Sequence, residues 1–232
     1  MQLIYKSSGI TMNQFVERIK EMNKGSKIAY MGRLDPMARG MVQILFDDEC
    51  YKMEQYIDMK KIYQVRVVVG LSSDSDDTLG IIQNKNFNTF DMSLLNMKFT
   101  QKDVKYNQAY HFYSTKQINK RKRNDMTHSY HDVTLYKSHI LEQSIMPLDS
   151  WVQKIVENIK TIDQTKNFRQ DEIILQWEQL ASNAKDSSHT IQYIDVELNV
   201  SSGFFVRQFI KDIMEETKIP LLCYDIHRVN IY

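Results

Sequence analysis

The sequence predicts a fold of the α+β class, because strand patterns and helix patterns occupy separate stretches of the chain. Residues 61–70 and 190–200 alternate apolar and polar side chains, a period of two that is typical of strands. Residues 147–185 repeat their apolar side chains at helical spacing instead. Strands beside segregated helices indicate an α+β domain. A chain of 232 residues, 42% of them hydrophobic, is long enough to bury the core of an enzyme.

The first predicted elements are a helix and a strand–loop–strand unit. The helix covers residues 11–22, because Thr11 is a capping residue and Gln14 stands at the capping-box position. Residues 28–46, IAYMGRLDPMARGMVQILF, contain two apolar stretches interrupted by glycines and by Asp35-Pro36. This pattern predicts two strands joined by an exposed loop.

The later elements follow from the same periodicities. Residues 61–70 form a strand that closes in the turn SSDSDDTLG, while the Asn- and Lys-rich stretch 81–108 shows weak periodicity and no clear element. The remaining predictions are a strand at 132–142, two helices within 147–185, a strand at 190–200 and a helix at 204–216.

Composition narrows the classes of function only slightly. A net charge of +1 gives no general argument for a nucleic-acid partner, although KQINKRKR at 116–123, preceded by aromatic residues 110–113, is a candidate for RNA contact or a solvated charged loop. No apolar run is long enough to span a bilayer. Cys50 and Cys223 have neither metal-ligand nor disulfide spacing and are predicted to be buried thiols.

Asp35 is the main candidate for chemistry. Proline at the next position restricts the backbone of Asp35 to extended geometry and so gives the carboxylate a defined direction, although Asp-Pro alone is also a common start of a turn. The wider string GRLDPMARG resembles the Gly-x-Leu-Asp-Pro-x-Ala-x-Gly signature of the TruB family of pseudouridine synthases.

Four further segments resemble that family in the same order along the chain. They are YKSSGIT at 5–11, KIYQVRVVVG at 61–70 with its following turn, SSGFFVRQFIKDI at 201–213 and IHRVNIY at 226–232. The matches extend over nearly the whole chain, and together they are more specific than any one of them.

The resemblance implies a pseudouridine synthase fold, with a mixed, mostly antiparallel central sheet flanked by helices. It also implies an isomerase that needs no metal and no nucleotide cofactor, and that flips the T-loop uridine 55 of tRNA out of its stack to act on it. Asp35 matches the essential aspartate, which either adds to C1′ of the sugar or abstracts a proton from it. Arg207 matches the arginine that pairs with this aspartate, and Tyr63 matches the tyrosine that stacks on the uracil.

The same resemblance suggests residues that contact the RNA. The expected substrate-binding residues are Lys6, Tyr30, Arg33, Lys61, Tyr113, Lys116 and Ile226, with Arg39 as a further candidate for a phosphate contact. Tyr30 stands where the family usually has histidine, and the segment around Tyr113 lacks the family's two prolines. Asp74 and Asp77 are expected to support a turn or the site.

The resemblance also predicts the organisation of the protein. We expect one catalytic domain over 1–232, with a helical insertion at about 145–188 and without the C-terminal RNA-binding PUA domain of bacterial relatives. The expected partner is the T-arm of tRNA, bound by a monomer inside the cell, in the cytoplasm.

Two other functions remain open. One is a synthase of the related RluA type, since Arg33-Leu34-Asp35 also resembles the core of that group, but Pro36 and the downstream turn favour TruB. The other is a catalytically silent RNA-binding or tRNA-folding protein, which the joint presence of Asp35, Tyr63 and Arg207 disfavours.

Overall fold

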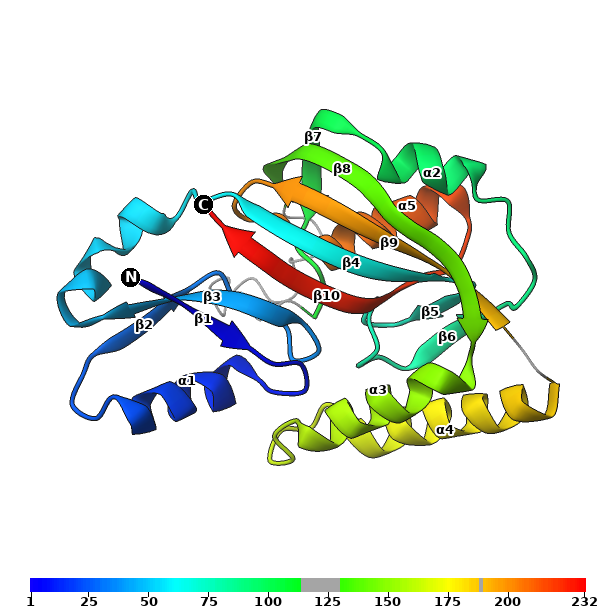
Figure 1. Cartoon of the computed structure of the whole chain (residues 1–232), viewed down its shortest axis with the longest axis horizontal. Helices are drawn as coiled ribbons and strands as arrows, with labels where there is room; N and C mark the ends of the chain where they lie inside the picture. Colours follow the sequence, from blue (N-terminus) through cyan, green and yellow to red (C-terminus); the bar gives the residue numbers. More distant parts are fainter. Residues whose placement is uncertain (114–129, 188–189) are drawn as a thin grey trace.

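The centre of the fold is a mixed β-sheet (Figure 1). The computed structural model describes residues 1–113, 130–187 and 190–232. Within these ranges an eight-stranded sheet runs in the order β1-β3-β10-β4-β9-β8-β7, and β2 also pairs with β3. The strands are β1 (Gln2–Lys6), β2 (Ile28–Met31), β3 (Arg39–Phe46), β4 (Lys61–Val69), β7 (Lys102–Ala109), β8 (Tyr130–Pro147), β9 (Thr190–Val200) and β10 (Leu221–Ile231). All pairs are antiparallel except β3 with β10, so the predicted fold class is confirmed.

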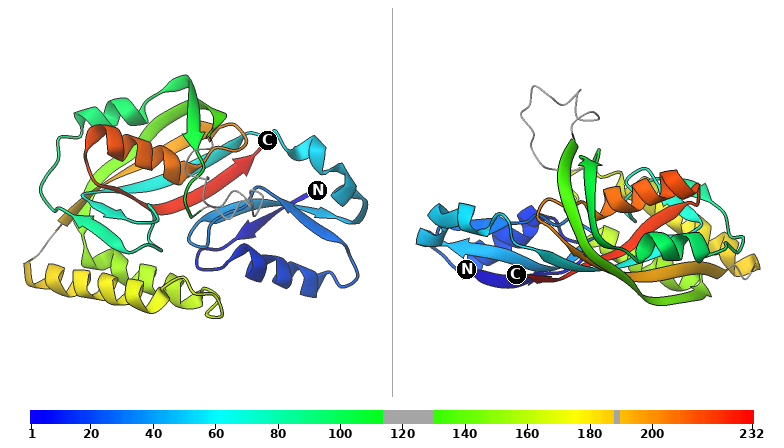
Figure 2. Two further views of the ribbon diagram at one scale, coloured as in Figure 1. Left: turned by 180° about the vertical axis from the view of Figure 1, so that it is seen from behind. Right: turned by 90° about the horizontal axis from the view of Figure 1, so that it is seen from above.

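Helices cover the sheet in three groups. The helix α1 (Met12–Met22) lies beside β1 to β3, and α2 (Ser93–Phe99) and α5 (Val206–Thr217) lie side by side on the face that Figure 2 (left) shows. The helices α3 (Asp149–Thr161) and α4 (Gln170–Ser187) form an antiparallel pair near the two-stranded sheet of β5 (Leu71–Ser73) and β6 (Ile82–Lys85). A 3-10 segment, η1 (Asp47–Tyr56), follows β3. No helix among the described residues is long and apolar enough to cross a membrane.

The helix α1 shows why the N-terminal prediction was correct. The Thr11 hydroxyl accepts a hydrogen bond from the Gln14 amide, and the Gln14 side chain accepts one from the Thr11 amide. This reciprocal capping box satisfies two of the amides that a helix start leaves unpaired.

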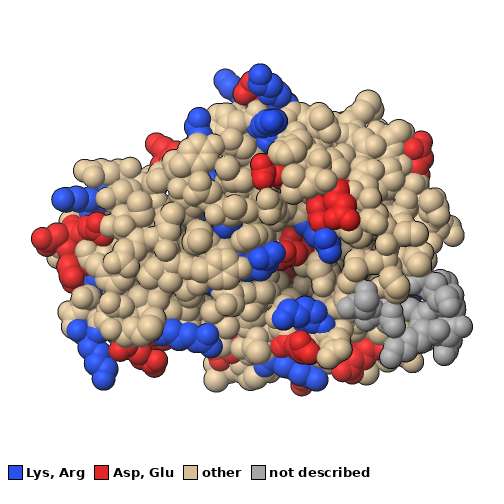
Figure 3. Space-filling view, viewed as in Figure 1, with Lys and Arg blue, Asp and Glu red and all other residues tan. Residues whose placement is uncertain are grey.

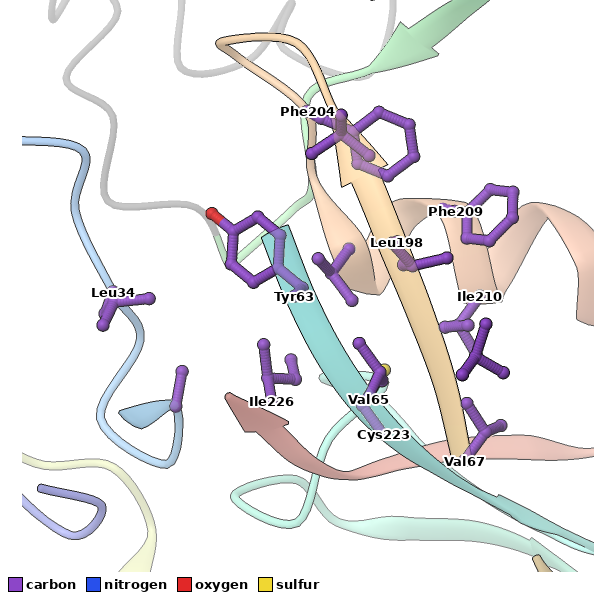
Figure 4. Packing of buried hydrophobic residues seen from close by; sticks show 14 of the residues in the cluster. Leu34, Tyr63, Val65, Val67, Leu198, Phe204, Phe209, Ile210, Cys223 and Ile226 are labelled. Atoms are coloured by element: carbon purple, nitrogen blue, oxygen red, sulfur yellow. The ribbon is translucent and has the colours of Figure 1, made fainter. Parts of the chain in front are cut away.

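Among the described residues, two hydrophobic clusters form the core. The first lies between the central sheet and the helices α1, α2 and α5, and the alternating residues of β4 and β9 face into it (Figure 4). The second cluster joins α3 and α4 to the β5–β6 sheet through Trp151, Ile155 and Trp177. The predicted strands at 61–70 and 190–200 and the two helices within 147–185 are thus confirmed, and the strand predicted at 132–142 is the middle of the longer β8.

Residues 81–108, for which the sequence predicted no element, contain β6, α2 and β7. The helix α2 has seven residues, so it presents fewer than two turns of periodicity to a sequence pattern. Its Leu95 and Phe99 are fully buried against the core, and tertiary packing therefore stabilises a helix that is too short to be stable by itself.

The N-terminal strands join the rest of the sheet at a narrow junction. The strand β3 pairs with β10 through two residue pairs, His227 with Arg39 and Arg228 with Gly40. A Cβ atom on Gly40 would lie 2.1 Å from the carbonyl oxygen of Arg228, and the φ angle of Gly40 is 121°. Only glycine allows this close approach, which sets the loop before β3 against the C-terminal strand.

Candidate active site

The loop between β2 and β3 carries Asp35, and a buried lysine holds this loop in place. Lys6 is inaccessible to solvent, and its Nζ donates to the carbonyl oxygens of Asp35 at 3.1 Å, Pro36 at 3.2 Å and Ala38 at 2.7 Å. Burial lowers the pKa of the Lys6 ammonium to about 7, although Asp35 acts in the opposite direction. The expectation that Lys6 meets an RNA phosphate is therefore wrong, because backbone carbonyls already occupy its ammonium group.

Asp35 forms an ion pair with Arg207 of α5. The Arg207 Nη2 atom lies 2.8 Å from Asp35 Oδ2, and the arginine side chain is 6% exposed whereas that of the aspartate is 30% exposed. Burial acts to lower the pKa of Arg207, but Asp35 and Asp77 outweigh it and raise the pKa. The arginine stays charged and directs the Asp35 carboxylate.

The turn after β5 fixes Arg207 from its other side. Arg207 Nη1 donates to the Ser75 carbonyl at 2.9 Å and lies 3.6 Å from Asp77 Oδ2. Asp77 is buried and accepts hydrogen bonds from the Ser75 hydroxyl and the Leu79 amide, so it supports the turn and the site together. Burial raises the pKa of Asp77, with Arg207 acting against that shift. Asp74 supports the same turn, because it accepts from the Ile81 amide.

A cavity of about 520 Å³ opens beside Asp35. Tyr63 of β4 and Ile226 of β10, both nearly buried, line it together with Asp35 and Arg207. In Figure 4 the Tyr63 ring lies in the region between Leu34 and Phe204, and its hydroxyl points away from the apolar side chains around Val65 and Val67. The volume lies within the range of small-molecule pockets and suits a nucleoside.

Cations dominate the polar lining of this cavity. Among the described lining residues, Arg33, Lys61, Arg207 and Arg228 face one carboxylate, Asp35. Lys61 is 7% exposed, and burial with the nearby Arg228 lowers the pKa of its ammonium to about 8. Arg228 is fully buried and donates to the carbonyls of Met41 and Gly32, but its Nη1 has no partner among the described residues. An anionic ligand would compensate this excess of buried positive charge.

Other predicted residues lie farther from the cavity. Arg39 is paired with Asp225 through hydrogen bonds of 2.7 to 3.1 Å and does not line the cavity, so the structure gives its suggested phosphate contact no support. Tyr30 accepts a hydrogen bond from Arg33, whose side chain lies at the mouth of the site. Tyr113 lines a second, adjoining cavity. Lys116, with the 116–123 cluster, lies outside the described residues.

Two groups of residues at the site were not predicted from the sequence. Arg228 and the Asn167–Arg169 segment both line cavities at Asp35, yet neither was singled out. Arg228 stands two residues after the apolar Ile226 in β10, so the period of two places both on the same, buried face, a weak signal that a charged side chain points inward. On the face that Figure 3 shows, outside the grey atoms, positive and negative side chains are interspersed.

The Asp35 arrangement has the chemistry of a nucleophile or base held in one orientation. A carboxylate oriented by a buried arginine can add to an electrophilic carbon or accept a proton. The aromatic ring of Tyr63 and the apolar Ile226 provide flat and nonpolar walls for a planar ring.

Residues 20–166 match the family described as TruB family pseudouridylate synthase (N terminal domain). The tRNA pseudouridine synthase B of Aquifex aeolicus (strain VF5) is 38% identical over 78 residues, which is 34% of this chain and 27% of that protein. The enzyme of the same name from Mycoplasmopsis pulmonis (strain UAB CTIP) is 38% identical over 85 residues, 36% of this chain and 30% of that protein. The matched region thus spans less than a third of these curated relatives.

Solved structures with the same fold include an H/ACA RNP bound to a substrate RNA containing 2′-deoxyuridine and a Cbf5-Nop10-Gar1 complex. Each aligns with 98% of this chain at a TM-score of 0.55 and 12% identity, and the alignments cover 46% and 47% of those chains. The predicted pseudouridine synthase fold is confirmed by this likeness.

Proposed function

The chain belongs to the TruB family of pseudouridylate synthases, and from this premise we propose that it isomerises the T-loop uridine of tRNA, uridine 55, to pseudouridine. The ion pair between Asp35 and the buried Arg207, at the edge of a nucleoside-sized cavity, is the observation that carries the proposal. The relatives that support it are named tRNA pseudouridine synthase B.

The reaction needs a carboxylate at the sugar. Breaking the bond from C1′ to N1, turning the base and rejoining it through C5 rearranges bonds within one nucleoside, with no net redox change. In our proposal Asp35 either adds to C1′ or takes a proton from the sugar, and both routes require its ionised form. Arg207 orients this carboxylate through the 2.8 Å ion pair.

The cavity supports a flipped base. A uridine inside a folded RNA loop is stacked, so C1′ and C5 are reached only after the nucleotide turns out into a pocket. We assign Tyr63 to stack on the uracil, with its hydroxyl as a candidate for moving the C5 proton, and Ile226 to wall the pocket.

The positive charge beside the cavity supports an RNA substrate. We propose that Lys61 and Arg33 face the phosphates next to the flipped nucleotide, and that the buried Arg228 adds to the positive electrostatic potential of the cavity. Tyr30 then lies beside the RNA strand that enters the site, where it offers an aromatic ring at the position at which the family usually has histidine.

We further propose that residues 1–232 form one catalytic domain in which about 145–188 is an insertion. In this proposal the protein acts as a monomer in the cytoplasm on the tRNA T-arm.

The test compares wild-type protein with Asp35→Asn on an unmodified tRNA. Pseudouridine is mapped by carbodiimide treatment and primer extension, and Asp48→Asn, an exposed aspartate of η1, is the matched control. We expect a stop at the T-loop uridine with wild type and control, and a rate at least about 1,000-fold lower with Asp35→Asn, because the reacting carboxylate is gone.

Parallel incubation with ribosomal RNA separates the related possibilities. A stop in ribosomal RNA alone would replace the tRNA assignment with an RluA-type one. Tight tRNA binding by wild type and Asp35→Asn, with no pseudouridine from either, would make the protein an RNA binder and refute the enzymatic proposal.

A further inference from the structure

A second cavity of about 330 Å³ adjoins the catalytic one. Of the residues that the structure describes, four line both cavities, namely Arg33, Leu34, Asp35 and Arg207. Asp35 therefore stands at the boundary between two spaces. The reaction assigned to the first cavity uses only one of them.

The loop between α3 and α4 forms one wall of this second cavity. Asn167, Phe168 and Arg169 line it, together with Thr11 and Met12 at the start of α1. These three residues belong to the stretch proposed as an insertion, so the cavity is built in part by a segment that the catalytic motifs do not include.

The α3–α4 loop is anchored firmly enough to serve as a wall. Arg169 binds the Asp74 carboxylate through two nitrogens, at 2.5 and 3.1 Å, and the Tyr113 hydroxyl donates to the same carboxylate at 3.1 Å. In α4, Trp177 Nε1 donates to the Thr78 carbonyl at 3.1 Å inside the core. These contacts fix the loop to the turn that also holds Arg207.

The helix α3 is tied to the other side of the site. The Thr161 hydroxyl donates to the Gly9 carbonyl at 2.8 Å, and the Gly9 amide donates to the Pro36 carbonyl at 3.0 Å. A Cβ atom on Gly9 would lie 2.3 Å from the Thr161 hydroxyl oxygen, so the two segments are in close contact. The helical pair thus contacts both segments that position Asp35.

The lining of the second cavity has the chemistry of a nucleotide site. Phe168 and the partly exposed Tyr113 provide aromatic surface, and the exposed Arg33 provides a cation, whereas Arg169 is already paired with Asp74. Two carboxylates among the described lining residues, Asp35 and Asp77, share the single cation of Arg207. A planar base stacks on such rings, and the phosphate of its nucleotide is attracted by Arg33.

We propose that the second cavity binds the nucleotide adjacent to the flipped uridine in the same RNA strand, and that Phe168 stacks on its base. This proposal rests on the proposed function, because it takes the target uridine to occupy the first cavity. Consecutive nucleotides are covalently linked, so a neighbour of a base at Asp35 lies within reach of the space on the other side of Asp35. Phe168 is then a specificity-determining residue supplied by the insertion.

The test uses an unmodified T-arm hairpin and two versions with an abasic nucleotide directly 5′ or 3′ of the target uridine. Phe168→Leu keeps an apolar side chain but removes the ring. Phe87→Leu is the matched control, since Phe87 is also partly buried against the second cluster but does not line the cavity. The melting temperature of each variant checks that it is folded. Both kcat/KM for pseudouridine formation and the dissociation constant of each hairpin are measured.

For wild type and Phe87→Leu we expect one of the abasic hairpins to lose about tenfold in kcat/KM and in affinity. Phe168→Leu is expected to lose about tenfold on the intact hairpin and nothing further on that abasic one. The proposal is overturned if Phe168→Leu keeps the wild-type ratio between intact and abasic hairpins, or if neither abasic hairpin differs from the intact one in wild type. If no pseudouridine forms but the affinity ratios behave as expected, the proposed reaction fails and the nucleotide site stands.

Discussion

Replacing Arg207 with methionine tests whether the buried charges at the site depend on one another. The substitution keeps a long, mostly apolar side chain in α5 but removes the cation that lies between Asp35 and Asp77. Asp35 is 30% exposed and can be solvated, whereas Asp77 is 6% exposed and cannot. The main cost of Arg207→Met therefore falls on Asp77.

The size of that cost follows from the burial. Removing one partner of a buried pair leaves an uncompensated charge, which costs about 3–5 kcal/mol. A neutral polar group left without a partner costs about 1–3 kcal/mol. We therefore expect Arg207→Met to lower the free energy of unfolding by about 4 kcal/mol at pH 7, and Arg207→Met with Asp77→Asn to recover about 2 kcal/mol of it. The amide oxygen that Asp77→Asn introduces can still accept the bonds that Ser75 and Leu79 donate.

The pH dependence supplies a second signature. Burial already raises the folded-state pKa of Asp77 above its unfolded value, and loss of Arg207 removes the cation that opposes this shift. A folded state with the higher pKa binds a proton first as pH falls, so acidification from pH 7 stabilises it relative to the unfolded chain. The loss of unfolding free energy that Arg207→Met causes relative to wild type should thus shrink as the pH is lowered toward the unfolded pKa of the aspartate. The loss in the double variant, which lacks this carboxylate, should not shrink.

Urea denaturation of the wild type, both single variants and the double variant at pH 7 and pH 5 measures these quantities. Equal unfolding free energies for Arg207→Met and the double variant at pH 7 would refute the idea that an unpaired Asp77 carries the cost. A deficit that does not change between the two pH values would refute it independently.

Three further predictions concern the supports of the site. Gly40→Ala should lower the unfolding free energy by at least about 3 kcal/mol in a thermal melt, because its Cβ would lie 2.1 Å from the Arg228 carbonyl oxygen; a change below about 1 kcal/mol would contradict the close approach. Lys6 has a folded pKa of about 7, below its unfolded value of 10.5. Between these pH values the unfolded chain binds more protons, so the contribution of Lys6 to the free energy of unfolding should rise by at most about 1.4 kcal/mol per pH unit. Lys6→Met should remove that rise from urea titrations, and an unchanged pH profile would count against it. Trp177→Phe removes the donor to the Thr78 carbonyl and should cost about 1–3 kcal/mol in urea while lowering kcat; an unchanged kcat would show that the turn does not depend on α4.

Local patterns predicted most of the fold. The capping box of α1 and the alternation in β4 and β9 depend on residues a few positions apart, so the sequence contains their whole signal. The helix α2 could not be predicted in the same way, because Leu95 and Phe99 are stabilised by contacts with distant elements.

Motifs predicted which residues to inspect at the site but not how each is used. Asp35 and Arg207 were singled out from separate segments, and the structure brings them to 2.8 Å. Lys6 was expected at the RNA, yet it is buried beneath the loop, since burial of a lysine depends on which carbonyls the fold brings to it. The contact of Arg169 with Asp74 joins residues 95 positions apart, a separation that no local pattern reports.

The two-pair junction between β3 and β10 also determines when activity can arise during synthesis. Asp35 leaves the ribosome with β1 to β3, but the strand that supports its loop, β10, is made almost 200 residues later, at residues 221–231. At about 5–20 residues per second, a bacterial or eukaryotic ribosome needs roughly 10–40 s for that interval. Until then the N-terminal strands expose the edge of β3 that β10 will occupy, an edge that can pair with another chain. A chaperone that shields this edge during translation should therefore raise the yield of correctly folded protein without contacting the Asp35 site.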